Sequence, residues 1–113
     1  MAELQNSTSQ HVFRIDRFIV PLSAREEFLA RVRQTHETLR MQPGFVRDLL
    51  VEQPADSGGV TILTLAEWDS HSRIEHAKAA VQAMQHEAQF NPRDLLARLG
   101  ITAEMGLYHP VDH

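Results

Sequence analysis

The sequence predicts a single α+β domain of the split βαβ kind, in which a four-stranded antiparallel sheet carries helices on one face. Segments rich in β-branched and aromatic residues alternate with segments of helical periodicity, in the order strand, helix, strand, strand, helix, short helix, strand. A chain of 113 residues also fits one domain and little more. We therefore expect one domain over residues 11–110, a disordered N-terminal tail at 1–10 and a short C-terminal tail at 111–113.

The first strand and helix have clear boundary signals. Residues 11–20 are rich in β-branched and aromatic side chains and predict a strand, which Pro21 ends. Ser23 and Glu26 then form the S-x-x-E pattern of a capping box. Because apolar residues recur at helical spacing after this box, residues 24–41 are predicted to form the first helix.

The middle of the chain predicts a β-hairpin. A Gln-Pro-Gly breaker at 42–44 precedes a strand at 45–53, and the turn-rich segment 54–59 separates it from a strand at 60–68. Because the connection between these two strands is short, they are expected to pair antiparallel.

The last third of the chain predicts two helices and a strand. Asp69 or Ser70 can cap the second helix. The apolar face of that helix has i, i+3, i+4 spacing and comprises Ile74, Ala77, Val81 and Met84. An Asn-Pro pair at 91–92 opens a short third helix, which Gly100 ends. Residues 101–109 are predicted to form the fourth strand.

The predicted strands are apolar on both faces. In the first strand, one side carries Phe13, Ile15 and Ile19, and the other carries Val12, Phe18 and Val20. An antiparallel sheet with one face in water should alternate cleanly between apolar and polar residues. The chain has no further element to cover the second face, and two-fold dimers are the commonest oligomers. We therefore expect a homodimer formed through the sheet face; the alternative is a monomer with loose patterning.

Composition excludes several classes of function. The net charge is -4 and no cluster of Lys and Arg is present, which argues against a nucleic-acid partner. The absence of cysteine excludes disulfides and zinc–thiolate sites. No apolar run approaches the roughly 20 residues of a membrane span, and the polar start of the chain does not resemble a signal peptide. We expect a cytoplasmic protein that binds neither nucleic acid nor membrane.

Several short motifs occur in the order found in a known family. They are QPGF at 42–45, EWDS at 67–70 and NPRDLLARLGI at 91–101. Over residues 11–110 the chain resembles the antibiotic biosynthesis monooxygenase (ABM) domain family. The resemblance implies a dimeric ferredoxin-like α+β barrel, in which two sheets pack face to face. It also implies a pocket in each subunit, between the sheet and the helices.

The resemblance carries over to few catalytic positions. In members that oxidise polyketides a Trp ends the third strand, and Trp68 matches it. The Asn four residues before that Trp and the Tyr six residues after it are replaced here by Thr64 and Ile74. Haem-degrading members need an Asn and a Trp where this chain has Asp16 and Ala77. The resemblance therefore implies a cofactor-independent monooxygenase that acts on a small aromatic or quinol-type substrate, and argues against haem degradation.

Three residues are candidates for catalysis. Trp68, the only tryptophan, either donates its indole N–H to a substrate from a pocket wall or packs as a core side chain. Asp16 would be costly to bury alone and would then serve as a base; the alternative is a pair with Arg14 or Arg47. His36 lies on the apolar stripe of the first helix. It suits general acid–base chemistry, or is a hydrogen-bonded histidine at the edge of the stripe.

The remaining candidates are expected to form the walls of the pocket and bind substrate: Thr64, Ile74, Phe28, Val32 and Tyr108. No cofactor is expected, because a substrate that forms a stabilised carbanion gives an electron to oxygen by itself once it is deprotonated and shielded from water. His71 and Glu75 stand one helical turn apart, but no third ligand is evident, so no metal is expected.

Two other functions remain open at this level. The first is a non-catalytic dimeric binder or sensor of a small apolar ligand. The second is an isomerase-like enzyme that uses the same base without oxygen.

Overall fold

The structure, a computed structural model, describes residues 10–111. The described elements are β1 (Val12–Val20), η1 (Leu22–Ala24), α2 (Arg25–Arg40), β2 (Phe45–Pro54), β3 (Val60–Trp68), α3 (His71–Glu87), α4 (Pro92–Leu99) and β4 (Thr102–Tyr108). Most of the tail predicted at 1–10, and residues 112–113, lie outside the described residues. Of the helices described, none is long and apolar enough to cross a membrane.

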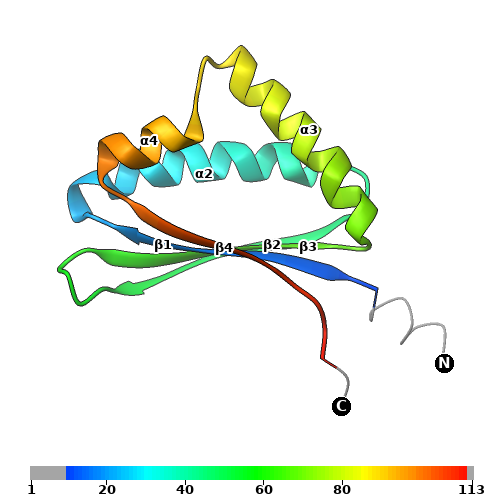
Figure 1. Ribbon diagram of the computed structural model, residues 1–113, viewed down its shortest axis with the longest axis horizontal. Helices are drawn as coiled ribbons and strands as arrows, with labels where there is room; N and C mark the ends of the chain where they lie inside the picture. Colours follow the sequence, from blue (N-terminus) through cyan, green and yellow to red (C-terminus); the bar gives the residue numbers. More distant parts are fainter. Residues whose placement is uncertain (1–9, 112–113) are drawn as a thin grey trace.

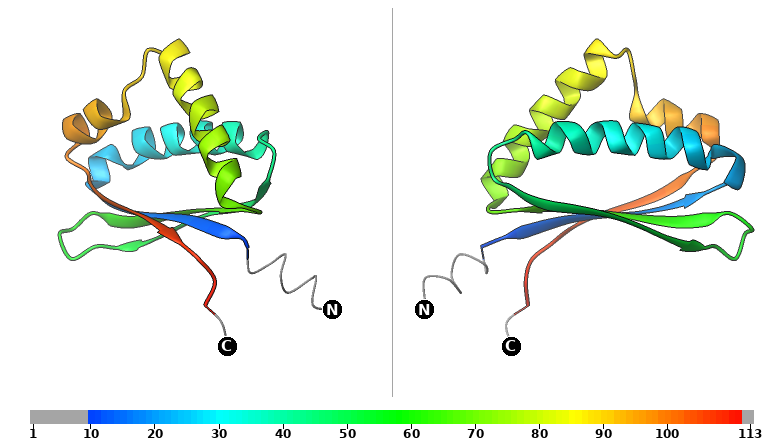
Figure 2. Two further views of the ribbon diagram at one scale, coloured as in Figure 1. Left: turned by 45° about the vertical axis from the view of Figure 1, so that its right-hand side comes forward. Right: turned by 180° about the vertical axis from the view of Figure 1, so that it is seen from behind.

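The strands form one antiparallel sheet in the order β2-β3-β1-β4. Helices α2, α3 and α4 all lie on the same face of this sheet (Figure 1, Figure 2). The first and third strands in sequence are therefore neighbours at the centre, and the second and fourth strands are the edges. This arrangement confirms the predicted α+β fold of the ferredoxin-like, split βαβ kind.

Short-range signals explain where α4 begins and ends. Asn91 caps α4, because its Oδ1 accepts from the backbone N–H groups of Arg93 at 2.9 Å and Asp94 at 3.2 Å. Gly100 follows α4 with a φ of 71°, the left-handed conformation that ends many helices and here turns the chain into β4. Ser70 is the N-cap of α3 but makes no cap hydrogen bond with its side chain.

The capping box predicted at the first helix is wrong. Ser23 lies inside the 3₁₀ turn η1, which the Ala24 N–H closes on the Pro21 carbonyl at 2.9 Å. Helix α2 therefore begins one residue later than predicted, with Ala24 as its N-cap and no side-chain cap hydrogen bond. Glu26 instead contacts the neighbouring Arg25 on the surface.

The helix-covered face holds two core clusters rather than one. The larger cluster lies where α2 and α4 meet the sheet and consists of Phe18, Val20, Ala24, Phe28, Leu29, Ile62, Leu95 and Ile101. The smaller cluster lies under the start of α3 and consists of Val12, Ala66, Trp68 and Ala77. Burial of apolar surface, worth roughly 25 cal/mol per Å², is the main force that holds the helices on the sheet.

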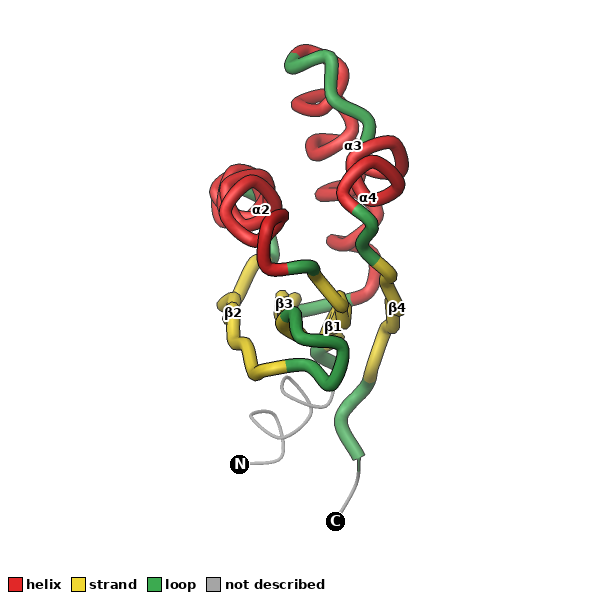
Figure 3. Tube along the Cα trace, turned by 90° about the vertical axis from the view of Figure 1, so that its left-hand side faces the viewer, coloured by secondary structure: helices red, strands yellow, loops and turns green. Residues whose placement is uncertain are grey.

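The opposite face of the sheet has no cover from the described elements. Figure 3 shows all three helices on one side of the strands. The central strands β1 and β3 present half-buried apolar side chains on this outer face: Phe13, Ile15, Ile19, Leu63 and Leu65. The edge strands add exposed side chains there, namely Leu49, Val51 and Tyr108. Contiguous apolar surface of this kind is typical of a protein–protein interface.

We expect two copies of the chain to pair through this outer face as a two-fold dimer. Leu49→Lys would place an ammonium group in the interface. Because desolvating a polar group without a partner costs at least about 2 kcal/mol, the dissociation constant should rise roughly 30-fold or more. Size-exclusion chromatography with multi-angle light scattering over a dilution series measures this change.

Leu22→Lys is the matched control, because it alters an exposed leucine on η1 rather than on the sheet. This variant should remain dimeric. A monomeric unsubstituted chain at micromolar concentration would contradict the expected dimer.

Candidate active site

A cavity of about 300 Å³ lies between the helix-covered face of the sheet and helices α2, α3 and α4. Its walls are mainly apolar and come from both core clusters, so the cavity occupies the space between them. Its polar lining consists of Arg14, Asp16, Arg31, Thr35, His36, Thr64, Lys78 and Gln85. A mostly apolar cavity with a few convergent polar groups is the usual form of a small-molecule site. In the described part of the chain, no group of three His, Asp or Glu is placed to hold a metal ion.

The cavity brings together seven of the eight residues predicted from the sequence: Trp68, His36, Asp16, Thr64, Ile74, Phe28 and Val32. Tyr108 is the exception, and its predicted place in the pocket is wrong. Strand β4 pairs Tyr108 with Phe13 on the outer face, where Tyr108 is 53% exposed. Because side chains alternate along a strand, Met105 rather than Tyr108 reaches the cavity from β4.

His36 is held between α2 and β2. It is only 5% exposed, and its Nδ1 lies 2.8 Å from Asp48 Oδ2. Arg40, one turn further along α2, donates to the same oxygen from Nε at 3.1 Å, and its Nη2 forms an ion pair with that oxygen at 2.9 Å. Since a carboxylate can only accept, the network assigns the proton to Nδ1 and leaves Nε2 of the neutral ring as the basic nitrogen. His36 is thus a hydrogen-bonded helix histidine that also lines the cavity.

Asp48 is kept ionised by the groups around it. Burial raises the pKa of Asp48, but hydrogen bonds from His36 and Arg40, together with their charges, outweigh this effect and lower the pKa below its ordinary value. At neutral pH the Asp48 carboxylate therefore fixes both the tautomer and the orientation of the His36 ring.

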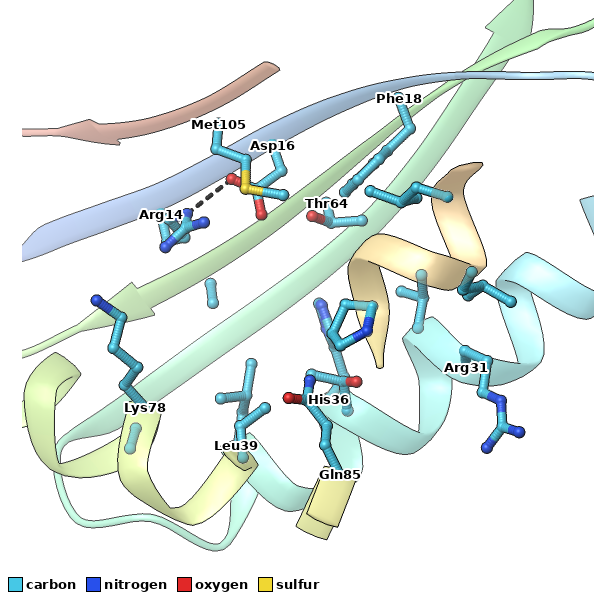
Figure 4. A pocket seen from close by; sticks show the side chains of 18 of the residues that line it. Arg14, Asp16, Phe18, Arg31, His36, Leu39, Thr64, Lys78, Gln85 and Met105 are labelled. Atoms are coloured by element: carbon cyan, nitrogen blue, oxygen red, sulfur yellow. Dashed lines mark hydrogen bonds and ion pairs between the residues drawn. The ribbon is translucent and has the colours of Figure 1, made fainter. Parts of the chain in front are cut away.

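Asp16 faces the cavity from β1 as half of an ion pair. Arg14, two residues earlier on the same face, donates from Nε to Asp16 Oδ1 at 2.7 Å (Figure 4). Of the two partners considered for Asp16, Arg14 is the one present. Arg47 instead pairs with Glu67, on the outer face, at 2.7 Å. Because the Asp16 carboxylate already accepts a hydrogen bond from Arg14, this geometry favours a positioning role for Asp16.

Trp68 forms the wall of the cavity at the end of β3. It is 2% exposed, and its ring meets Phe45 edge-to-face with centroids 5.5 Å apart. It belongs to the smaller core cluster as well, so the two roles considered for Trp68 coexist. Thr64 is buried on the same strand face and presents its hydroxyl to the cavity.

The sequence prediction missed five polar groups of the lining, namely Arg14, Arg31, Thr35, Lys78 and Gln85, and also Asp48, which contacts His36. Alternation along β2 puts Asp48 on the helix-covered face with Leu50, and the same alternation can be read from the sequence of the predicted strand. Lys78 and Gln85 stand at i, i+3, i+7 spacing with Val81, so they lie on the apolar stripe of α3. A search for apolar residues at helical spacing does not identify Lys78 and Gln85, because both side chains are polar.

Solved structures match this chain, whereas no family model and no curated protein does. SnoaB, a cofactor-independent oxygenase from Streptomyces nogalater, is 27% identical over 92% of this chain and 96% of its own, with a TM-score of 0.69. A protein of Shewanella loihica PV-4 provisionally named a monooxygenase is 19% identical over 93% of this chain and 98% of its own, with a TM-score of 0.67.

A third similar structure comes from Nitrosomonas europaea and is provisionally named an antibiotic biosynthesis monooxygenase. It is 18% identical over 91% of this chain and 92% of its own, with a TM-score of 0.63. The fold is thus shared with proteins named as oxygenases and as an ABM-type monooxygenase, which confirms the resemblance to the ABM domain family predicted from the sequence. At this level of identity, the second and third structures support the fold alone.

The contact between His36 and Asp48 yields a stability prediction. Asp48→Asn removes a partly buried carboxylate that accepts charge-assisted hydrogen bonds, so we expect a loss of about 1–3 kcal/mol in the free energy of unfolding at pH 7. Because the folded-state pKa of Asp48 is lowered, its contribution is present above the unfolded-state pKa and is lost as the pH falls through the folded one. The difference between the two proteins should therefore shrink below about pH 4.

Urea denaturation at several pH values measures both effects. Asp56→Asn, in the exposed turn between β2 and β3, is the matched control and should change stability by less than about 0.5 kcal/mol. Equal losses in the two variants at pH 7 would argue against a stabilising role for Asp48.

Proposed function

We propose that this protein is a cofactor-independent monooxygenase that oxidises a small aromatic, quinol-type substrate with molecular oxygen, and that His36 is its base. The observation that carries the proposal is the pair of His36 and Asp48 at the wall of an apolar cavity. The similarity to SnoaB, a cofactor-independent oxygenase, supports the reaction class.

Proton abstraction is the first step of the proposed reaction. Asp48 holds Nδ1 of His36, so Nε2 is the nitrogen that accepts a proton from the activated C–H group of the substrate. The imidazolium that forms is stabilised by the Asp48 carboxylate. Asp48 acts through His36 and is therefore a positioning residue.

Oxygen then reacts with the substrate carbanion. One electron passes from the carbanion to O₂, and the resulting substrate radical and superoxide combine to form a C–O bond. The imidazolium of His36 returns its proton to the peroxide. Loss of the second hydrogen of the same carbon breaks the O–O bond and leaves a carbonyl and one molecule of water. One oxygen atom stays in the product, and the substrate supplies every electron, so the reaction needs no external reductant.

The walls of the cavity serve this chemistry by excluding water. Trp68, Phe28 and Ile74 surround the space with apolar surface, in which a carbanion is not quenched by bulk solvent. The indole N–H of Trp68 and the hydroxyl of Thr64 are the donors proposed to bind the substrate oxygen, on which negative charge develops as the proton leaves.

A non-catalytic binder is the second candidate. It is favoured by Thr64 and Ile74, which stand where the polyketide-oxidising relatives have an Asn and a Tyr. A binder would keep the same cavity and the same ligand class but would not turn the ligand over.

Oxygen uptake with anthrone and a panel of quinols tests the proposed function. His36→Gln should lower kcat by about 10²–10⁴-fold, because it removes the general base. Trp68→Phe should raise KM or lower kcat by a smaller factor. His76→Gln, which changes an exposed histidine of α3 that does not line the cavity, is the matched control and should retain full activity.

The same panel, run under argon, separates the candidate functions. Turnover in air that stops under argon supports the oxygenase. Product formation that continues under argon indicates isomerase-like chemistry with the same base. Saturable binding without turnover of any substrate indicates the binder.

A further inference from the structure

The cavity has a cationic end opposite His36. Arg14 reaches it from β1 and Lys78 from α3, as Figure 4 shows, where the Lys78 side chain extends toward Arg14. Asp16 is the only carboxylate among the lining residues, so this end carries more positive than negative charge. The chain as a whole has a net charge of -4, and the cationic end therefore contrasts with the overall charge of the protein.

The register of the sheet determines the distance between the cationic end of the cavity and the end at His36. Asp48 pairs with Ala66, and Ala66 pairs with Arg14, so these residues form one row across β2, β3 and β1. Neighbouring strands lie about 4.8 Å apart, so the backbones at Asp48 and Arg14 are roughly 10 Å apart. His36 stands above the Asp48 end of the row, and the small side chain of Ala66 leaves the floor between the ends open.

Arg14 is oriented to bind an anion. Its Nε donates to Asp16, which fixes the guanidinium plane. Its two terminal nitrogens donate to no side chain among the described residues, and together they match the fork of a carboxylate. Arg31, the third cation of the lining, is placed differently, because its guanidinium lies 4.5 Å from the centre of the Phe90 ring. Arg14 and Lys78 therefore form the cationic end of the cavity.

We propose that the ligand of this cavity is an aromatic carboxylate, whose carboxylate binds Arg14 and Lys78 while its ring extends over Ala66 toward His36. The position of the reactive carbon beside His36 rests on the proposed function; the selection of an anionic ligand does not. The separation of roughly 10 Å between the backbones at Asp48 and Arg14 matches the length of a bicyclic aromatic acid. Arg14 and Lys78 act in binding and orientation, and Asp16 positions Arg14.

Two redox-inert probes of the same shape test the proposal. We expect 2-naphthoate to bind at least roughly tenfold more tightly than 2-naphthalenemethanol, because charge-assisted hydrogen bonds distinguish them. Isothermal titration calorimetry measures both affinities. Quenching of Trp68, the only tryptophan and a wall of the cavity, reports that binding occurs there.

Substitutions assign the selectivity to the cationic end. Arg14→Gln and Lys78→Gln should each weaken 2-naphthoate roughly tenfold and leave 2-naphthalenemethanol within about twofold, whereas Arg14→Lys should recover part of the loss. Lys78 is exposed on α3, so its variant tests the proposal even if Arg14→Gln does not fold. Arg33→Gln makes the same charge change outside the cavity and should bind both probes normally.

Equal affinities for the two probes, or 2-naphthoate binding that Arg14→Gln and Lys78→Gln leave unchanged, would overturn the proposal. Because neither probe has an oxidisable carbon of the kind the oxygenase requires, these outcomes are independent of oxygen uptake. A protein that selects 2-naphthoate but consumes no oxygen keeps this inference and loses the proposed reaction.

Discussion

The pairing register of the four strands is the constraint on which the site depends. A single row of paired residues places Asp48 on an edge strand, Ala66 near the centre and Arg14 one strand further along, all on the helix-covered face. A shift of one residue in either pairing would turn one of these side chains to the opposite face. Apolar residues that share this face on β1 and β3, such as Val12, Phe18 and Ile62, hold this register, because they are buried under the helices in only one alignment.

The separation of the core into two clusters lowers packing stability and leaves room for the cavity. A space between the clusters forgoes packing contacts that a filled core would make. The helices are instead held at their ends, by Phe18 and Phe28 in the larger cluster and by Trp68 and Ala77 in the smaller one. The hydrogen bonds that Asp48 accepts from His36 and Arg40 tie the C-terminal end of α2 to the edge of the sheet. The cavity therefore stays open without loosening the elements that surround it.

Sequence patterns predict most of the fold because it depends on local periodicity and turn chemistry. The strand at 60–68 and the Asn91 cap follow directly from residue types. The Ser23 cap does not, because a 3₁₀ turn is set by how Pro21 leaves the sheet. Residue types do not reveal the face on which Tyr108 lies, because that face depends on the register of β4 against β1. The partnership of His36 with Asp48 joins two elements, so neither residue alone reveals it.

The position of His36, the proposed base, shows that the shape of this cavity and its chemistry depend on different residues. A fold of this kind supplies the sheet, the helices and the space between them, whereas reactivity depends on the few polar groups that reach that space. At position 64 of β3 this chain presents the hydroxyl of Thr64, and at position 74 of α3 it presents the apolar side chain of Ile74. The ionised partner of the buried His36 comes from edge strand β2. If the protein is an oxygenase, proton transfer therefore takes place at the boundary of α2 and β2, with Trp68 as wall and donor.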